Sequence, residues 1–202
     1  MRPIAIIAGL LAAAFWVNAI QAEQPSASQA HQFSFASIDG SSLPLSSYRG
    51  KVLLVVNTAS QCGYTPQYKG LQTLWQTYQD RGLVVIGVPS NDFGGQEPEH
   101  EGKILKFCQG TYGVTFPLTT KQRVKGPAAH PFYAWAAKTL GAKGKPQWNF
   151  HKYLVGSDGR LLAWFSSPTK PMSAEIRDAV EKALTSANAS PVPDRAAGAG
   201  RS

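Results

Sequence analysis

The sequence predicts an α/β domain with a mixed central sheet flanked by helices. Residues 51–57 and 82–89 each contain an unbroken run of apolar, mostly β-branched side chains, which is typical of parallel strands buried on both faces. The stretch between these runs carries apolar residues at helical spacing. A strand, a helix and a strand in this order predict a βαβ unit.

The helix of this unit is predicted to begin near Thr65 and to end before Gly82. Thr65 can cap the helix and Pro66 suits its first position. The predicted apolar face consists of Tyr68, Leu71, Leu74, Trp75 and Tyr78.

One strand is predicted before this unit and three helices after it. Residues 33–38 alternate between apolar and polar side chains and then turn at Asp39 and Gly40. The helices are predicted over about residues 98–112, 131–140 and 173–184, the last capped by Ser173.

A hairpin is predicted between the last two helices. Residues 150–155 and 160–165 flank a Ser-Asp-Gly turn, which is a strong hairpin signal. This order of elements on a mixed sheet is what a thioredoxin-like fold requires, and no internal repeat is visible.

The 202 residues, 43% of them hydrophobic, suit one domain with a full core. We expect residues 1–22 to be a signal peptide, 23–31 a linker and 32–185 the domain. Residues 186–202 contain a single larger apolar side chain, so we expect a disordered tail there.

The N-terminus has the pattern of a secretory signal. Arg2 precedes an uncharged apolar run over residues 4–17, and small residues follow at Ala19 and Ala22, either of which could precede the cleavage site. The run is shorter than the roughly 20 residues that span a bilayer. We therefore expect export to the periplasm or beyond the cell, with an uncleaved membrane anchor as the alternative.

The formal net charge is +8, but the positive residues are scattered as singles and pairs. This distribution indicates a solvated basic surface. We expect no nucleic-acid partner and no stable membrane insertion of the mature chain.

The chain has two cysteines, Cys62 and Cys108, which are too few for a disulfide-stapled scaffold. Cys62 follows the first buried strand and precedes a helix, where free N–H groups favour a reactive thiolate. The spacing excludes a Cys-x-x-Cys exchange site. A buried, inert cysteine packed under the loop is the alternative interpretation.

Three motifs around these positions resemble those of the glutathione peroxidase family. Residues 57–65, Asn-Thr-Ala-Ser-Gln-Cys-Gly-Tyr-Thr, resemble the family's peroxidatic-cysteine signature. Residues 87–98, Gly-Val-Pro-Ser-Asn-Asp-Phe-Gly-Gly-Gln-Glu-Pro, and residues 148–150, Trp-Asn-Phe, are similar to its second and third signatures. The resemblance covers about residues 33–184, with the motifs in the family's order.

The resemblance implies a thiol peroxidase with a catalytic tetrad of Cys62, Gln96, Trp148 and Asn149. The Cys62 thiolate would attack a peroxide oxygen, while the two amides and the indole donate N–H groups to the sulfur and to the developing negative oxygen. Reduction of hydrogen peroxide and of organic or lipid hydroperoxides would then form part of an oxidative-stress response.

The resemblance also implies a role for Cys108. Attack leaves a sulfenic acid on Cys62, and Cys108 occupies the position of the resolving cysteine in the two-cysteine, thioredoxin-dependent members. A Cys62–Cys108 disulfide would be the second catalytic state. Because Cys108 falls on a predicted helix with apolar neighbours, we expect that helix to unwind locally during turnover.

Two departures from the family pattern stand close to the site. Ser90 replaces a cysteine that many relatives carry, and Asp92 replaces the more usual glutamine, so we expect Asp92 to add a negative charge near Cys62. The stretch between Lys125 and Trp148 is short, as in the compact, monomeric members.

We expect a peroxide substrate and a thiol reductant, either a thioredoxin-like protein or glutathione, with no cofactor and no metal. A peroxide redox sensor and a thiol–disulfide oxidoreductase remain as alternatives.

Overall fold

The computed structural model describes residues 29–97 and 99–189. The predicted signal peptide, most of the predicted linker and residues 190–202 lie outside these ranges. No helix of the described residues is both long enough and apolar enough to cross a membrane.

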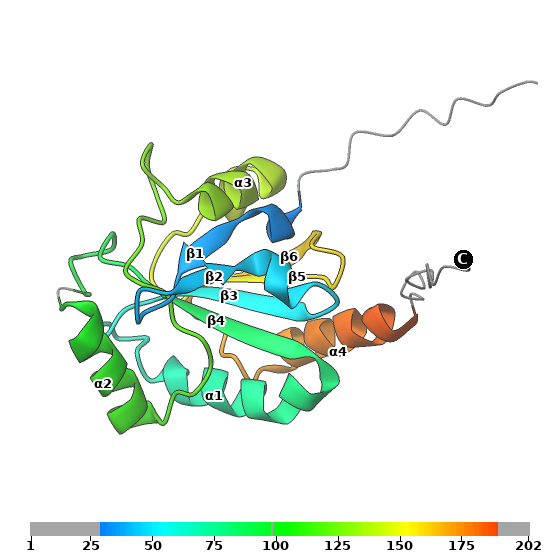
Figure 1. Ribbon diagram of the computed structural model, residues 1–202, viewed down its shortest axis with the longest axis horizontal. Helices are drawn as coiled ribbons and strands as arrows, with labels where there is room; N and C mark the ends of the chain where they lie inside the picture. Colours follow the sequence, from blue (N-terminus) through cyan, green and yellow to red (C-terminus); the bar gives the residue numbers. More distant parts are fainter. Residues whose placement is uncertain (1–28, 98, 190–202) are drawn as a thin grey trace, which may run out of the picture.

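A four-stranded mixed sheet forms the centre of the domain, with strand order β4-β3-β5-β6 (Figure 1). β3 (Val52–Thr58) pairs in parallel with β4 (Leu83–Pro89) and antiparallel with β5 (Lys152–Val155). β5 pairs antiparallel with β6 (Leu161–Phe165). The predicted βαβ unit, the hairpin and the α/β thioredoxin-like class are therefore confirmed.

Helices cover both faces of the sheet (Figure 1). α1 (Gln67–Tyr78) and α4 (Ala174–Ala189) lie on one face, and α3 (Pro131–Leu140) lies on the other. Alternate residues of β3 enter two separate core clusters: Val52, Leu54 and Val56 face α1 and α4, whereas Leu53 and Val55 face α3. Both sets are fully buried, which explains the unbroken apolar run in the sequence.

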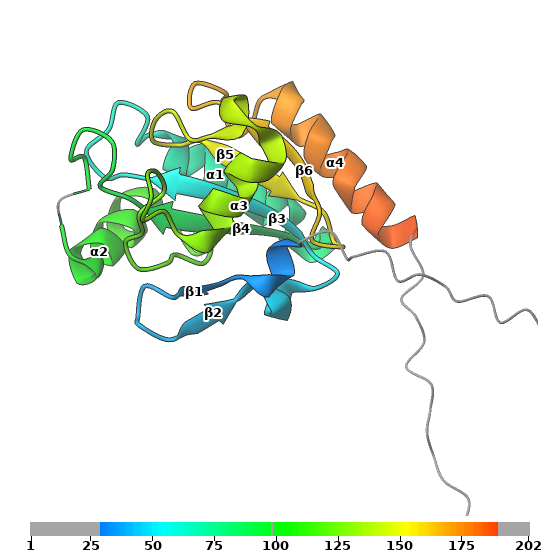
Figure 2. The same cartoon turned by 90° about the horizontal axis from the view of Figure 1, so that it is seen from above.

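The remaining elements surround this sheet. α2 (Glu101–Tyr112) lies beyond the carboxyl end of β3, and the antiparallel pair β1 (Ser34–Ala36) and β2 (Ser42–Pro44) lies on the β4 side, away from β6 (Figure 2). Within the described ranges, short 3-10 helices span Ala30–Gln32, Leu45–Tyr48, Gln79–Arg81 and Ala142–Gly144.

The segment after α2 is held along β4 at Gly87. The Gly87 N–H donates to the Pro117 carbonyl and its carbonyl accepts from the Thr119 N–H, both at 2.9 Å. A Cβ on Gly87 would lie 2.5 Å from the end of the Leu118 side chain, so a larger residue here would force that side chain to move. The chain that leaves α2 is thereby fixed to the sheet.

Two expected helix boundaries differ from those in the structure. α2 begins at Glu101 rather than near residue 98. α4 continues to Ala189, beyond the predicted helix end near residue 184 and into the first residues of the expected tail. There the hydroxyls of Thr185 and Ser186 donate to carbonyls one turn earlier.

One predicted helix cap is confirmed and another is wrong. The Ser173 hydroxyl accepts a 3.5 Å hydrogen bond from the N–H of Ile176 in α4. Thr65 does not cap α1: its hydroxyl accepts from the Cys62 N–H at 2.9 Å and donates to the Ala59 carbonyl at 2.8 Å. Thr65 therefore organises the turn that carries Cys62.

Candidate active site

Cys62 lies in the turn between β3 and α1, at the carboxyl end of the buried strand. Its carbonyl accepts from the Thr65 N–H at 2.9 Å, and its Sγ accepts from the Tyr64 N–H at 3.4 Å. The residue is only 8% exposed, more enclosed than its small, polar neighbours suggest. A backbone donor aimed at the sulfur is the arrangement that a thiolate needs.

Gln96 and Asn149 are joined directly, although 53 residues separate them in the sequence. The Asn149 Nδ2 donates to the Gln96 Oε1 at 3.0 Å. The Gln96 carbonyl accepts from the Gln61 N–H at 3.0 Å, which ties this pair to the cysteine turn. The carboxamide NH₂ of Gln96 has no hydrogen-bond partner among the described residues and is available to a ligand.

Trp148 forms the exposed rim of the site. Its side chain is among the few large hydrophobic ones that are exposed, at 40%, and its ring lies 5.7 Å from that of Phe93. A Cβ on Gly94 would lie 3.5 Å from the Gln96 side chain and 3.6 Å from Trp148. Gly94, at φ 64°, therefore lies between the amide and the indole.

The turn that carries Trp148 and Asn149 is fastened to the end of β3 by Asn57. The Asn57 side chain donates to the Trp148 carbonyl at 3.1 Å, and its own carbonyl accepts from the Phe150 N–H at 2.6 Å. The ring of Phe150 is fully buried and packs edge-on against Tyr68 at 5.3 Å. Asn149 is thus held buried beside the cysteine turn.

The two residues after Phe150 anchor the same segment. The buried Lys152 ammonium donates to three carbonyls in the loop after β6, the nearest being that of Thr169 at 2.6 Å. His151 stacks on Trp164 at 5.3 Å, and burial lowers the pKa of the imidazole to about 4. Both side chains have structural roles here.

Cys108 lies in α2 and is completely buried, with a free thiol. It belongs to the same apolar cluster as Cys62, as expected for a helix residue with apolar neighbours. Burial raises the pKa of the Cys108 thiol to about 11. The Cys108 carbonyl accepts from the Val114 N–H at 3.1 Å, beyond the helix end at Gly113.

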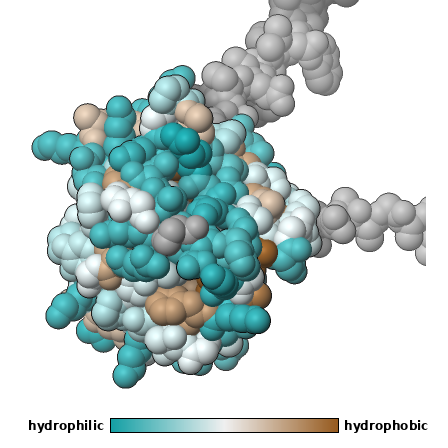
Figure 3. Space-filling model, turned by 90° about the vertical axis from the view of Figure 1, so that its left-hand side faces the viewer, coloured by the Kyte–Doolittle hydropathy of each residue, from teal (hydrophilic) through white to brown (hydrophobic). Residues whose placement is uncertain are grey.

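A small hollow of about 220 Å³ lies between the cysteine turn and α2. It is lined by Ser60 and Gln61 from the turn and by Lys103, Ile104 and Phe107 from the helix, together with Glu99. Figure 3 views this end of the molecule, whose surface is mainly hydrophilic with a smaller hydrophobic area.

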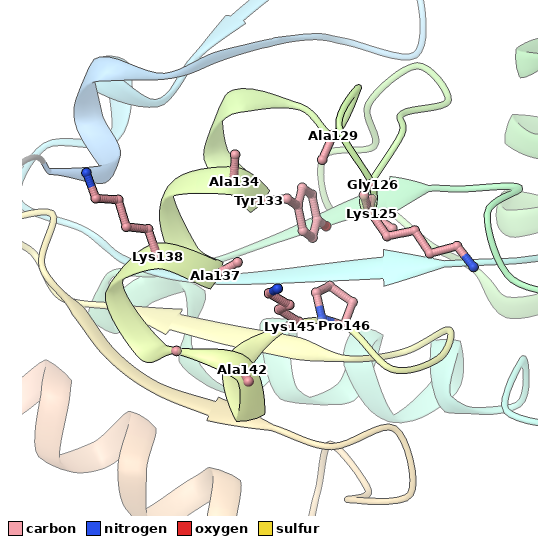
Figure 4. Close-up of a pocket in the computed structure, with 12 residues that line it drawn as sticks. Lys125, Gly126, Ala129, Tyr133, Ala134, Ala137, Lys138, Ala142, Lys145 and Pro146 are labelled. Atoms are coloured by element: carbon pink, nitrogen blue, oxygen red, sulfur yellow. The ribbon is translucent and has the colours of Figure 1, made fainter.

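A larger cavity of about 550 Å³ lies between α3 and the segments that precede and follow it (Figure 4). Lys125, Lys138 and Lys145 line it beside alanines and Tyr133. None of the predicted tetrad residues contributes to its wall.

The expected effect of Asp92 on Cys62 is not supported by the geometry. The Asp92 carboxylate accepts from the N–H groups of Val124 at 2.6 Å and Lys125 at 3.1 Å, and pairs with Arg123 at 3.2 Å. The negative charge of Asp92 is therefore compensated by residues 123–125. Ser90 is buried and accepts from the Asp92 N–H at 3.3 Å.

Two buried groups near Cys108 were not predicted as site residues. Glu97 is fully buried, its carboxylate accepts from the Ser60 hydroxyl at 3.1 Å, and burial raises its pKa to about 7. Tyr68 is fully buried on α1, and burial raises the pKa of its hydroxyl well above the ordinary value. The signal for Glu97 was an acidic residue directly after Gln96, whereas Tyr68 matched the helical periodicity of a core residue.

The structure thus joins two of the four tetrad residues, Gln96 and Asn149, by a hydrogen bond and ties Gln96 to the turn that carries Cys62. The hydrogen bonds of Cys62 itself come from its own turn. Among the described residues, no cluster of His, Cys, Asp or Glu could hold a metal ion.

Comparison with known proteins gives consistent matches. The family model described as glutathione peroxidase matches residues 30–137. The hydroperoxy fatty acid reductase of Synechocystis sp. is 47% identical over 160 residues, covering 75% of this chain and 94% of the relative. A glutathione peroxidase-like peroxiredoxin of Schizosaccharomyces pombe is 48% identical over 140 residues, covering 68% and 88% respectively.

Solved structures agree with these sequence matches. The crystal structure of Trgpx in apo form is 37% identical, with a TM-score of 0.64 over 79% of this chain and 97% of that one. A thioredoxin-family thiol:disulfide interchange protein of Chlorobium tepidum superposes with a TM-score of 0.59 over 80% and 99% at 18% identity, which shows a shared fold.

Proposed function

The chain belongs to the glutathione peroxidase family and is a thiol-dependent peroxidase, and from this premise we propose that Cys62 is the sulfur that attacks the peroxide. One observation carries this assignment. The Gln96–Asn149 pair is hydrogen-bonded to the turn of Cys62, so the donor groups and the thiol are held by one network.

In the first step the Cys62 thiolate attacks one peroxide oxygen. An S–O bond forms, the O–O bond breaks, and the departing oxygen takes a proton to leave as water or an alcohol. Gln96 and Trp148 offer N–H groups that no described residue occupies, and these donors stabilise the charge that develops on the leaving oxygen. Cys62 is left as a sulfenic acid.

Cys108 is the proposed resolving thiol. It attacks the Cys62 sulfenic acid, forms a disulfide and releases water, and an external thiol then reduces the disulfide. Because Cys108 starts fully buried within α2, the last turns of that helix unwind to let it reach Cys62. A thioredoxin-like protein is the proposed reductant, with glutathione as the second candidate.

The proposed substrates are hydrogen peroxide and organic or lipid hydroperoxides. The exposed indole of Trp148 offers an apolar surface against which a bulky organic peroxide can lie. A relative that is 47% identical is named as a hydroperoxy fatty acid reductase.

The test uses the reduced chain, treated with one equivalent of peroxide and mapped by mass spectrometry without reduction. We expect a Cys62–Cys108 disulfide in the unaltered chain, a trapped sulfenic acid at Cys62 in Cys108→Ser, and no peroxide consumption in Cys62→Ser. Undiminished peroxide consumption by Cys62→Ser would contradict the assignment. Steady-state turnover with thioredoxin separates an enzyme from a redox sensor, which would react once and stop.

We also propose that the chain is exported and acts as a monomer. Support for export comes from the apolar run over residues 4–17 and from Ala19 and Ala22. Support for the monomer comes from the short connection between Lys125 and Trp148. N-terminal sequencing of protein from each cell fraction and light scattering of the purified chain test the two proposals.

A further inference from the structure

The cavity beside α3 combines apolar walls with positive charge. Its volume of about 550 Å³ is within the range of small-molecule sites, and most of its wall consists of alanines, glycines and other apolar side chains. Among the described residues, those with a charge that line it are Lys125, Lys138 and Lys145, and no acidic side chain lines it. A cavity of this composition suits an organic anion with an apolar body.

The three lysines are spread along the cavity (Figure 4). The Lys145 side chain is directed towards Ala137 of α3, across the cavity. Lys125 extends towards the carboxyl ends of β3 and β4, where the cysteine turn lies, and Lys138 lies at the opposite end. No carboxylate in the described part of the chain forms an ion pair with these ammonium groups. An anion in the cavity therefore meets a lysine that has no acidic partner.

Tyr133 adds a buried polar group to the wall of this cavity. The residue is 1% exposed, and its hydroxyl has no hydrogen-bond partner within the described ranges. Its ring packs edge-on against Tyr153, whose own hydroxyl donates to the Gly144 carbonyl at 2.5 Å. Because buried hydroxyls are ordinarily paired, the Tyr133 oxygen indicates a place where a polar group of a ligand can bind.

Both walls of the cavity continue into the segments that carry the tetrad. The Asp92 carboxylate accepts from the N–H groups of residues 124 and 125, which ties one wall to the loop that carries Gln96. The opposite wall ends at Pro146, two residues before Trp148. The cavity and the active site are thus built on the same two segments.

Lys125 and two aromatic rings connect the cavity with the rim of the active site. The Lys125 ammonium lies 4.6 Å from the centroid of the Phe93 ring, and that ring lies 5.7 Å from the ring of Trp148. Because the indole of Trp148 is exposed, an apolar chain that leaves the cavity beside Lys125 meets an apolar surface at the rim. A molecule with an anionic group in the cavity can therefore extend its chain to the site of Cys62.

We propose that this cavity binds the carboxylate end of free fatty acid hydroperoxides, with Lys145 as the residue that pairs with the carboxylate. The inference rests on the proposed function, because it names the class of organic hydroperoxide that the same site prefers. A fatty acid carboxylate is ionised at neutral pH, and the adjoining part of its chain packs against the alanines of the cavity. The oxidised part of the chain crosses Trp148 and presents its hydroperoxide group to Cys62.

The experiment compares two substrates that differ in charge. The reduced full chain reacts with the hydroperoxide of linoleic acid or with that of its methyl ester, both kept too dilute to form micelles. The quantity measured is the second-order rate constant of Cys62 oxidation, and the rate constant with hydrogen peroxide is the reference for every variant.

Two variants change the cavity and a third is the matched control. Lys145→Glu reverses the charge that meets the carboxylate, and Ala137→Phe fills the space opposite it. Lys143→Glu makes the same change of net charge two residues away, at an exposed lysine that does not line the cavity.

We expect the unaltered chain to react roughly 5- to 20-fold faster with the acid than with the ester, the range of a charge-assisted contact at a partly exposed site. Lys145→Glu should abolish this preference and Ala137→Phe should reduce it, each relative to the hydrogen peroxide rate of the same variant. Lys143→Glu should keep the preference. The preference should also shrink as the salt concentration rises.

Isothermal titration with linoleate, which carries no hydroperoxide group, tests the cavity separately from the chemistry. Linoleate should bind the unaltered chain and lose roughly 5-fold or more in affinity in Lys145→Glu. Inorganic phosphate, which lacks an apolar chain, should not compete with it.

Equal rate constants for acid and ester in the unaltered chain would overturn the proposal. A preference that survives in Lys145→Glu, or one that is lost to the same extent in Lys143→Glu, would overturn it as well. Failure of the proposed function has a different signature, because hydrogen peroxide would then leave Cys62 of the unaltered chain unoxidised while linoleate would still bind.

Discussion

The carbonyl oxygen of Asn57 accepts a 2.6 Å hydrogen bond from the N–H of Phe150, the only described non-glycine residue with a positive φ, 63°. Such a conformation costs on the order of 1–3 kcal/mol for a side chain of this kind. Burial of the Phe150 ring and the second bond from Asn57 to Trp148 hold it in place. This backbone turn directs Asn149 inward and leaves Trp148 at the rim.

Asn57→Ala should therefore weaken the site as well as the fold. The Trp148 carbonyl loses its partner and the fully buried Asn57 side chain leaves a cavity, so we expect a loss of about 2–3 kcal/mol in the free energy of unfolding and roughly a 10-fold slower reaction with peroxide. Urea denaturation and rapid-mixing kinetics measure the two effects. Gln72→Ala is the control, because it removes two hydrogen bonds to Thr115 elsewhere in the fold. An equal loss of peroxide reactivity in this control would show that the slower reaction results from lower stability of the fold and not from the loss of the Asn57 contacts.

Gln96→Ala should slow the first chemical step directly. The substitution removes an unengaged amide donor and the partner of Asn149. Loss of a donor to a developing negative oxygen typically costs about 10²- to 10³-fold in rate. The second-order rate constant of Cys62 oxidation is the quantity to measure. Gln147→Ala, at an exposed position beside Trp148, should leave this constant unchanged, and an equal reduction in both variants would contradict the role of Gln96.

Gly110→Ala should slow disulfide formation while stabilising the resting protein. Gly110 is an exposed residue of α2 after Cys108, and a Cβ there would meet no atom within 4 Å. Alanine is favoured over glycine in helices by about 0.5–1 kcal/mol, which raises the cost of unwinding. We expect roughly a 3- to 5-fold slower disulfide step.

Gly102→Ala provides the control for this prediction, because Gly102 lies in the first turn of the same helix. Its effect on the disulfide step should be small, whereas thermal unfolding of both variants should shift upward. Identical disulfide rates in the two variants would show that the last turns of α2 need not unwind.

Glu97→Gln should change how stability depends on pH. The folded state holds the carboxyl proton more tightly than the unfolded chain, since the pKa rises from 4.5 to about 7. The resulting stabilisation is complete below about pH 4.5 and is lost as the pH rises through 7, a change of at most about 3 kcal/mol. The neutral glutamine should remove this decline.

Urea denaturation of both proteins at a series of pH values tests this prediction. His151 acts in the opposite sense, because its lowered pKa makes the fold less stable as the pH falls below 6.5. The difference between variant and unaltered chain cancels that contribution. If the difference in the free energy of unfolding between the two proteins is constant from pH 4.5 to 8, burial does not raise the pKa of Glu97.

The sheet could be predicted because its signal is local. The strand around Val55 is apolar at every position from Val52 to Val56, and that pattern admits few alternatives to a strand buried on both faces. The role of Thr65 could not be predicted in the same way. A threonine before a proline is a good cap by sequence, but the Cys62 N–H and the Ala59 carbonyl compete for its hydroxyl only once the turn has formed.

The tetrad positions came from motif resemblance and not from spacing, since Gln96 and Asn149 lie far apart in the chain. Gln96 follows β4 and Asn149 precedes β5, and their pairing depends on both of these strands lying beside β3 in the sheet. Glu97 was missed because its burial is a tertiary property: the same residue on an open loop would have an ordinary pKa. Tyr68 was assigned to the core, which is where it lies, but periodicity does not reveal which polar group it faces.

The burial of Cys108 within α2 also limits how fast the proposed Cys62–Cys108 disulfide can form. In the proposed mechanism, a sulfenic acid at Cys62 has no internal partner until α2 opens, and a second peroxide can oxidise it irreversibly to the sulfinic acid. The rate of this second oxidation depends on the peroxide concentration, whereas the rate at which α2 opens does not. The stability of the last helical turn of α2 thus sets the peroxide concentration above which overoxidation of Cys62 outpaces disulfide formation and inactivates the protein.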